Sequence, residues 1–246
     1  AAAAWSAYHS AERLLEGSRQ MGNEWNDAAT TFEGAAALFQ ALTSISGRSE
    51  VRAAAGIMAG NCFVRSADCY RCIFQPDAMA SALESASEAY SDVAPIVGPS
   101  AGDAAVTAIT QAAYVAKQTG RPLKAAKLYR KASEIAFDVG IERMFQVAVV
   151  MSLRAVEIYV ERGMLGEARA CYTRSVGIAV VHLHDPGSAI DLLERLVDVS
   201  LEEERPLVLF RALLCRLACI PPCIGVDTDE AINDCEYVLD QYSDLC

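Results

Sequence analysis

The sequence lacks the long apolar segments that cross membranes. None of its apolar runs reaches the roughly 18 residues that a spanning helix needs, and the longest candidate is Val176–His182. The N-terminus also lacks a basic region ahead of an apolar core, so we expect no signal peptide. The chain opens with Ala1–Ala4 in place of an initiator Met and stops at Cys246, and we expect that both ends are trimmed.

Strand signals are also scarce. The β-branched residues are scattered and no Asn-Gly hairpin turn occurs, whereas apolar residues, many of them Ala, make up 53% of the chain. The sequence therefore predicts an all-α protein.

Motifs of catalysis and nucleotide binding are absent. Neither a GxxxxGK[ST] nor a GxGxxG motif occurs. His182 and His184 precede Asp185, but no nucleophile elbow accompanies them, and His at a helix end more often caps it. We expect a protein that is not an enzyme and that has no cofactor.

The cysteines do not form a metal site. Cys69 and Cys72 make a single CxxC, but zinc needs four ligands and no second pair follows. Most of the nine cysteines occupy helical apolar positions, such as Cys171, Cys215 and Cys219. We interpret them as reduced core residues of a cytosolic protein without a metal.

Charge is unevenly distributed. The net charge of −11 argues against a nucleic-acid partner. Nevertheless, the segment from 117 to 131 holds six bases and no acid, and no Lys or Arg follows Arg216. Such asymmetry favours two surfaces for partners of opposite sign, although a basic run can also be a solvated helix face and an acidic end a polar cap. The bases are Lys117, Arg121, Lys124, Lys127, Arg130 and Lys131; the acids of the end are Asp227, Asp229, Glu230, Asp234, Glu236, Asp240 and Asp244.

A repeated pattern organises the chain. Two copies place a Gly first, Ala at +5, Tyr at +9 and a small residue at +12, which puts the last three on one helix face. The Gly ends the preceding helix, so each unit reads as helix, turn, helix. This pattern predicts a tetratricopeptide-like α-solenoid of antiparallel helix pairs, as one domain over residues 1–246. The copies are Gly120/Ala125/Tyr129/Ala132 and Gly163/Ala168/Tyr172/Ser175, with partial copies at Ala28/Phe32/Ala35, Met79/Leu83/Ala86 and Ala231/Cys235/Val238.

About eleven helices are expected, with an irregular loop where prolines and glycines gather at Ala94–Gly102. The expected helices are Ala7–Met21, Glu24–Ser44, Glu50–Ile73, Pro76–Val93, Asp103–Thr119, Pro122–Val139, Glu142–Arg162, Gly166–Val181 and Ser188–Ser200, then one from Pro206 to about Ile220 and one after Asp227.

The order of these signals resembles the soluble NSF attachment protein (SNAP) family. The resemblance is carried by Trp25–Phe32, by Pro76–Val93 and most specifically by Leu123–Tyr129, followed by Glu142-Arg143, Gln146–Ala148 and Glu167-Ala168. The run from Leu123 looks most similar to the gamma branch. The resemblance implies a membrane-attachment loop near the family's N-terminus, and this sequence begins about where that loop would end.

The resemblance implies a non-catalytic adaptor that binds SNARE complexes (syntaxin-type and related SNAREs) and recruits the disassembly ATPase NSF in vesicle trafficking. It implies a cytoplasmic protein, peripherally associated with endomembranes. The alternative is a tetratricopeptide-type scaffold subunit of another complex. The SNARE-binding candidates are Lys117, Lys124, Lys127, Lys131, Arg143 and Arg154; the NSF-binding candidates are Asp229, Glu230, Asp234 and Glu236.

Overall fold

The structure, a computed structural model, describes residues 1–17 and 22–202. Every regular element in these residues is a helix, which confirms the predicted all-α class. The chain divides into two compact units, Ala1–Met144 and Phe145–Cys246, which we describe separately. The described helices are α1 (Ala2–Gly17), α2 (Gly22–Ile45), α3 (Ser49–Cys72), α4 (Pro76–Val97), α5 (Pro99–Gln118), α6 (Pro122–Val139), α7 (Glu142–Glu161), α8 (Leu165–Val181) and α9 (Pro186–Glu202).

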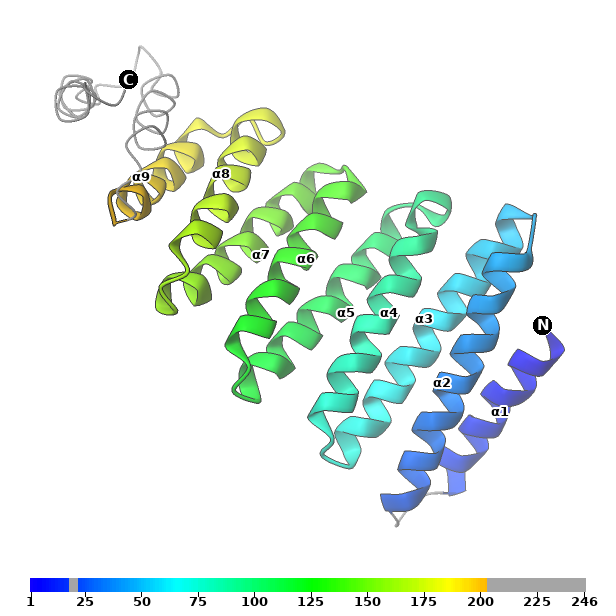
Figure 1. The fold of residues 1–246 in the computed structure, drawn as a ribbon. Helices are drawn as coiled ribbons and strands as arrows, with labels where there is room; N and C mark the ends of the chain where they lie inside the picture. The colour runs from blue at the N-terminus through cyan, green and yellow to red at the C-terminus, as the bar shows by residue number, and fades with distance from the viewer. Residues whose placement is uncertain (18–21, 203–246) are drawn as a thin grey trace, which may run out of the picture. The chain divides into compact units, whose positions relative to one another are not determined.

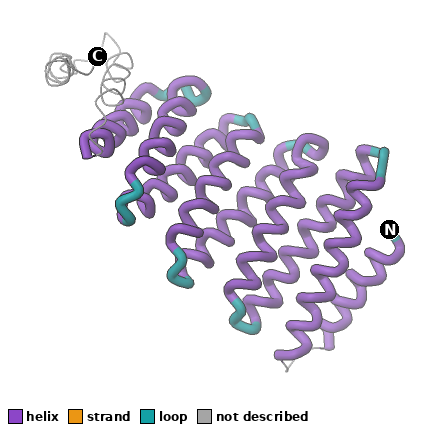
Figure 2. Tube along the Cα trace, in the orientation of Figure 1, coloured by secondary structure: helices purple, strands orange, loops and turns teal. Residues whose placement is uncertain are grey.

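Within the first unit, helices α1 to α6 pack side by side in chain order, and successive helices run antiparallel (Figure 1). Short turns join α2 to α6 in succession, and the α3–α4 and α5–α6 turns share the lower edge of the unit (Figure 2). Because each helix packs on its neighbours in the sequence, the unit has the predicted solenoid arrangement of helix pairs.

The repeated small–aromatic–small residues form the core between helices. Tyr129 is 4% exposed and Tyr172 7% exposed, and the small residues on either side of each are completely buried. Phe32 and Leu83 fill the same place in the partial copies on α2 and α4. The predicted register is therefore confirmed in all four copies that the structure describes, although Met79 is only half-buried.

The glycines that begin the two full copies adopt the left-handed conformation. Gly120 has φ +73° and Gly163 has φ +67°, which most side chains avoid and glycine adopts freely. The Gly120 N–H donates to the Lys117 carbonyl at 3.2 Å, and the next N–H reaches back to the Ala116 carbonyl at 2.9 Å. This pattern satisfies the last carbonyls of α5 and turns the chain into α6.

Two glycines on α3 bring that helix close to α4. A Cβ built on Gly56 would lie 2.2 Å from Val93 Cγ1, and one built on Gly60 would lie 2.5 Å from Tyr90 Cε1. The Tyr90 hydroxyl donates a 2.7 Å hydrogen bond to Asn61 Oδ1, so this buried phenol has a polar partner. The absence of side chains at 56 and 60 thus creates the space that α4 fills.

The prediction of an irregular loop at Ala94–Gly102 is wrong. Helix α4 continues through Pro95 to Val97, α5 begins at Pro99, and Gly98 alone joins them. Pro95 lies in the last turn of α4, Pro99 occupies the first position of α5, where its missing N–H is harmless, and Gly98 supplies a φ of +95°. The prolines and glycines therefore mark two abutting helix ends.

The second unit contains most of α7 together with α8 and α9. The Ser152 hydroxyl on α7 donates to the Cys171 carbonyl on α8 at 3.1 Å, which links these helices inside the core. Asp185 precedes α9 and accepts hydrogen bonds from the Ser188 N–H and hydroxyl. The helices predicted from Pro206 onward lie outside the described residues.

No helix among the described residues is long and apolar enough to span a membrane.

Candidate protein-binding surface

The basic row on α6 extends along one helix face. Arg121 immediately precedes the helix, Lys124 and Lys127 follow at intervals of three, and Lys131 lies four further on, so the three lysines project to the same side of α6. The opposite face of α6 buries Ala125, Tyr129 and other core residues. The base-rich segment is thus an exposed amphipathic face that the core holds in register.

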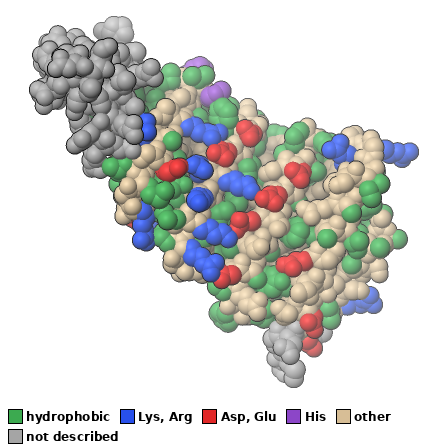
Figure 3. Space-filling view, in the orientation of Figure 1, with side chains coloured by type: hydrophobic (Ala, Val, Ile, Leu, Met, Phe, Trp, Pro, Cys, Tyr) green, Lys and Arg blue, Asp and Glu red, His purple; other side chains and the backbone are tan. Residues whose placement is uncertain are grey.

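Carboxylates on α4 partner this row. Arg121 Nη2 lies 2.7 Å from Asp77 Oδ2, and Lys131 Nζ lies 2.8 Å from Glu88 Oε1. Figure 3 shows the result as Lys and Arg side chains interleaved with Asp and Glu side chains on the face toward the viewer. The predicted basic patch is therefore largely charge-compensated by a neighbouring helix.

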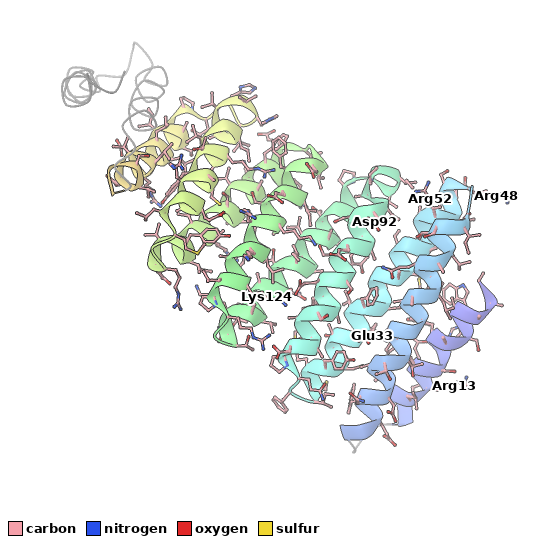
Figure 4. All side chains as sticks on the ribbon, viewed as in Figure 1. Arg13, Glu33, Arg48, Arg52, Asp92 and Lys124 are labelled. Atoms are coloured by element: carbon pink, nitrogen blue, oxygen red, sulfur yellow. The ribbon has the colours of Figure 1, made fainter. Side chains whose placement is uncertain are left out.

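Lys124 makes a third contact, with Nζ 2.6 Å from Glu84 Oε1. The contact is a close attraction between the charges of a partly exposed ammonium and a partly exposed carboxylate. Lys124 lies near the start of α6, facing α4 (Figure 4).

The partners are separated by nearly constant distances in the sequence. Arg121 and Asp77 are 44 residues apart, and Lys131 and Glu88 are 43 apart. Arg143, just before the second unit, pairs with Asp103 on α5, 40 residues earlier. Acids of one helix pair thus meet bases of the next at the period of the repeat.

These ion pairs are exposed and therefore weak. The Lys131 and Glu88 side chains are 41% and 61% exposed, and those of Arg121 and Asp77 are 51% and 62% exposed. Exposed pairs typically contribute about 0–1 kcal/mol because water and salt screen them. A partner with denser negative charge can therefore displace the α4 carboxylates at little cost.

Lys117 and Lys127 differ from the other lysines predicted to bind SNARE complexes. Both are exposed, and neither has an ion-pair partner within the described part of the chain. They are the candidates whose charge is most available to another molecule. The α6 candidates belong to the first unit, whereas Arg154 is exposed on α7 and belongs to the second unit.

The acidic NSF-binding candidates lie outside the described residues: these are Asp229, Glu230, Asp234 and Glu236.

The acids on α4 were not predicted as part of this surface. Asp77, Glu84 and Glu88 were not singled out because they are dispersed among apolar residues. The signal that could have revealed them is the offset of 40 to 44 residues between acids and bases, which matches the repeat.

Among the described residues, Cys62, Cys69 and Cys171 are buried, as expected of core residues, whereas Cys215 and Cys219 lie outside the described part of the chain. Burial raises the pKa of the Cys69 thiol to about 11 and that of Cys62 to about 12, so both stay protonated near neutral pH. Cys72 is exposed and free. No cluster of three or more metal-binding side chains occurs in residues 1–17 and 22–202.

Comparison with known families identifies the chain. The family model described as "Soluble NSF attachment protein, SNAP" matches residues 4–228. The chain belongs to the SNAP family. The match spans both compact units. It includes the ion pairs between the α4 carboxylates and the basic row, as well as the start of the acidic end. Proteins of this family are non-catalytic adaptors.

One of the similar solved structures supports the helical-repeat fold. A circular tandem repeat protein with novel repeat topology is 14% identical, with a TM-score of 0.50 over 89% of this chain and 65% of that one. The crystal structure of BtubC (BKLC) from P. vanneervenii is also 14% identical, with a TM-score of 0.41 over 98% of this chain and 87% of that one. The curated proteins contain no match.

Proposed function

We propose that this protein is a non-catalytic adaptor that binds assembled SNARE complexes and presents them to the ATPase NSF. The match of the SNAP family model to residues 4–228 is the observation that carries the proposal. On the same basis, we place the protein in the cytoplasm, peripherally associated with endomembranes. The similarity of the run from Leu123 to Tyr129 to the gamma branch is the reason to assign that branch.

The exposed bases supply the proposed contact with SNARE bundles, whose surfaces are acidic. Lys117 and Lys127 offer unpaired charge, whereas Lys124, Lys131 and Arg143 would exchange their present carboxylates for those of the partner. Arg154 is a further candidate on the second unit. Long-range attraction of this kind accelerates association and weakens with added salt.

At the other end, the acids Asp229, Glu230, Asp234 and Glu236 are the proposed contacts for basic residues of NSF. Their role is proposed from the family resemblance and from the excess of acids after Arg216. The competing assignment, a scaffold subunit of an unrelated complex, predicts no binding to either partner.

The test is association with a recombinant SNARE complex, measured at low and high salt, followed by recruitment of NSF. The variant Lys117→Glu/Lys127→Glu should slow association at low salt. The matched control is Arg48→Glu/Arg52→Glu, which makes the same charge change at two exposed arginines near the α2–α3 turn, away from Lys124 (Figure 4). Equal effects of the two double variants would show that only net charge matters. No binding by the unaltered protein would refute the adaptor function.

Recruitment has its own variant. Changing Asp229, Glu230, Asp234 and Glu236 to the corresponding amides should abolish NSF recruitment while SNARE binding persists. If recruitment survives, the acidic end is a polar cap of the solenoid.

A further inference from the structure

Phe74 occupies a position that glycine holds elsewhere in this chain. The turns α5–α6 and α7–α8 place Gly120 and Gly163 nine residues before the buried Tyr of the next helix. In the α3–α4 turn, nine residues before Leu83, the residue is Phe74, with φ +55°. The repeat thus brings a bulky aromatic residue to a left-handed backbone position.

The hydrogen bonds of the three turns are the same. The Phe74 N–H donates to the Arg71 carbonyl at 3.2 Å, and the Gln75 N–H donates to the Tyr70 carbonyl at 3.0 Å. Gly163 N–H and the N–H that follows it make the equivalent bonds at 2.9 and 2.8 Å. A glycine would therefore fit the α3–α4 turn without any change of the backbone.

Phe74 has no visible role in holding the fold together. A side chain in the left-handed region is strained, and the Phe74 ring is 91% exposed, so packing does not offset that strain. A large exposed apolar side chain is also unfavourable in water. A conformational outlier of this kind points to function.

The ring borders an apolar hollow. Phe74, Pro76 and Met79 line it from the α3–α4 side, and Tyr114 and Val115 line it from α5, around a volume of about 320 Å³. Tyr114 is itself 58% exposed. A volume of about 320 Å³ has room for one large apolar side chain, which a flat lipid surface would leave unfilled.

Around the hollow, basic side chains outnumber acidic ones by one: Arg71, Lys117 and Arg121 against Asp68 and Asp77. Arg71 lines it, and Lys117 follows Tyr114 by one helical turn on α5 without an ion-pair partner in the described structure. Arg71 and Arg121 are balanced by Asp68 and Asp77 through exposed ion pairs. In a chain of net charge −11, a local excess of base favours an acidic partner.

We propose that the Phe74 hollow, lined by Phe74, Pro76, Met79, Tyr114 and Val115, docks an acidic peptide segment of a partner protein. One large apolar side chain of that segment inserts between Phe74 and Tyr114, while its carboxylates face Arg71 and Lys117. The site shares Lys117 with the proposed SNARE-binding bases, and it goes beyond the proposed adaptor function through its apolar lining beside the α3–α4 turn.

The probe is a 12-residue peptide of Asp and Glu with one central Leu, labelled with fluorescein so that its affinity can be measured. It is titrated into protein whose methyl groups are isotope-labelled for NMR. Saturable shifts of the Met79 and Val115 methyl signals are expected. Phe74→Gly should weaken binding by about tenfold, as for removal of an interface anchor, while the melting temperature stays the same or rises because glycine suits the turn. The control Ile45→Ser removes another exposed apolar side chain, 81% exposed at the end of α2, and should leave affinity unchanged.

Four outcomes would overturn the proposal. They are the absence of saturable methyl shifts, equal binding of a peptide with Ala in place of Leu, equal binding by the Phe74→Gly variant, and a matching loss with Ile45→Ser. Phe74-dependent binding to phosphatidylserine vesicles without peptide binding would instead assign the hollow to a membrane surface. Phe74-dependent self-association in sedimentation would assign it to a second copy of the chain.

Discussion

The ring of Tyr90 on α4 lies directly against the backbone of Gly60 on α3, where a Cβ would come within 2.5 Å of the ring. A methyl group at this position must displace a side chain that is only 7% exposed and hydrogen-bonded to Asn61. Helices α3 and α4 therefore depend on glycine for their separation.

We expect Gly60→Ala to lower the free energy of unfolding by about 1–3 kcal/mol, the usual cost of overpacking. The matched control is Gly34→Ala on α2, where nothing lies within 4 Å of the added Cβ. That change should stabilise by up to about 1 kcal/mol through helix propensity. Urea denaturation of both variants checks the pair, and equal effects would mean that the Tyr90 contact is unimportant.

Tyr129 and Tyr172 should be equivalent in energy because they fill the same place in successive repeats. Both are buried, at 4% and 7% exposure, and burial raises the pKa of Tyr172. Truncating either to Ala should cost about 3–5 kcal/mol, as for other large buried side chains. A loss below about 1 kcal/mol at both positions, measured by chemical denaturation, would contradict their role as anchors of the core.

Two buried serines should be replaceable with a gain in stability. Ser87 and Ser133 are 0% and 1% exposed, and their hydroxyls have no hydrogen-bond partner in the structure. Because an unsatisfied buried hydroxyl is unfavourable, Ser→Ala at either position should stabilise by about 1 kcal/mol. The control is Ser152→Ala, which removes the buried bond to the Cys171 carbonyl and should destabilise by a similar amount. Thermal melts should give higher melting temperatures for the Ser87 and Ser133 variants than for the Ser152 variant. The opposite order would show that water supplies hydrogen bonds to the Ser87 and Ser133 hydroxyls.

Asp185 should make the stability of the second unit depend on acid pH. Hydrogen bonds from Ser188 hold the pKa of Asp185 below its usual value of 3.8, so the ionised form is favoured in the folded state. The contribution of Asp185 to the free energy of unfolding is fully present at pH values above 3.8. It is lost as the pH falls through the lowered pKa of the folded state. Asp185→Ala should therefore cost about 0.5–2 kcal/mol near neutral pH, as for other helix caps, and less near pH 2. Asp185→Asn should retain most of the stability, and a pH-independent difference between Asp and Ala would contradict this account.

Much of the fold could be predicted from the sequence, because the repeated residues are those that adjacent helices need. The spacing of Gly120 and Tyr129 predicts a turn at the first and a buried position at the second. The structure has Gly120 in the left-handed turn and Tyr129 in the core. The prediction of a loop at Ala94–Gly102 was wrong because composition cannot distinguish a loop from two helix ends that meet at one residue.

The surface was harder to predict. Whether Lys124 is available to a partner depends on Glu84, which is 40 residues away and is brought beside it only by helix packing. Phe74 was not noticed because a left-handed φ at a non-glycine residue has no signature in the sequence. Both features become evident when the repeats are compared with one another in the structure.

The single-residue junction at Gly98 also makes this part of the chain a poor substrate for proteases. Cleavage requires a stretch of several residues to leave the protein and extend across the enzyme, and exposed flexible loops provide it. Between Val97 and Pro99 there is no such stretch, because any extension must first unwind the end of α4 or the start of α5. The richest cluster of glycine and proline in the sequence is therefore a point that native-state proteolysis should leave intact.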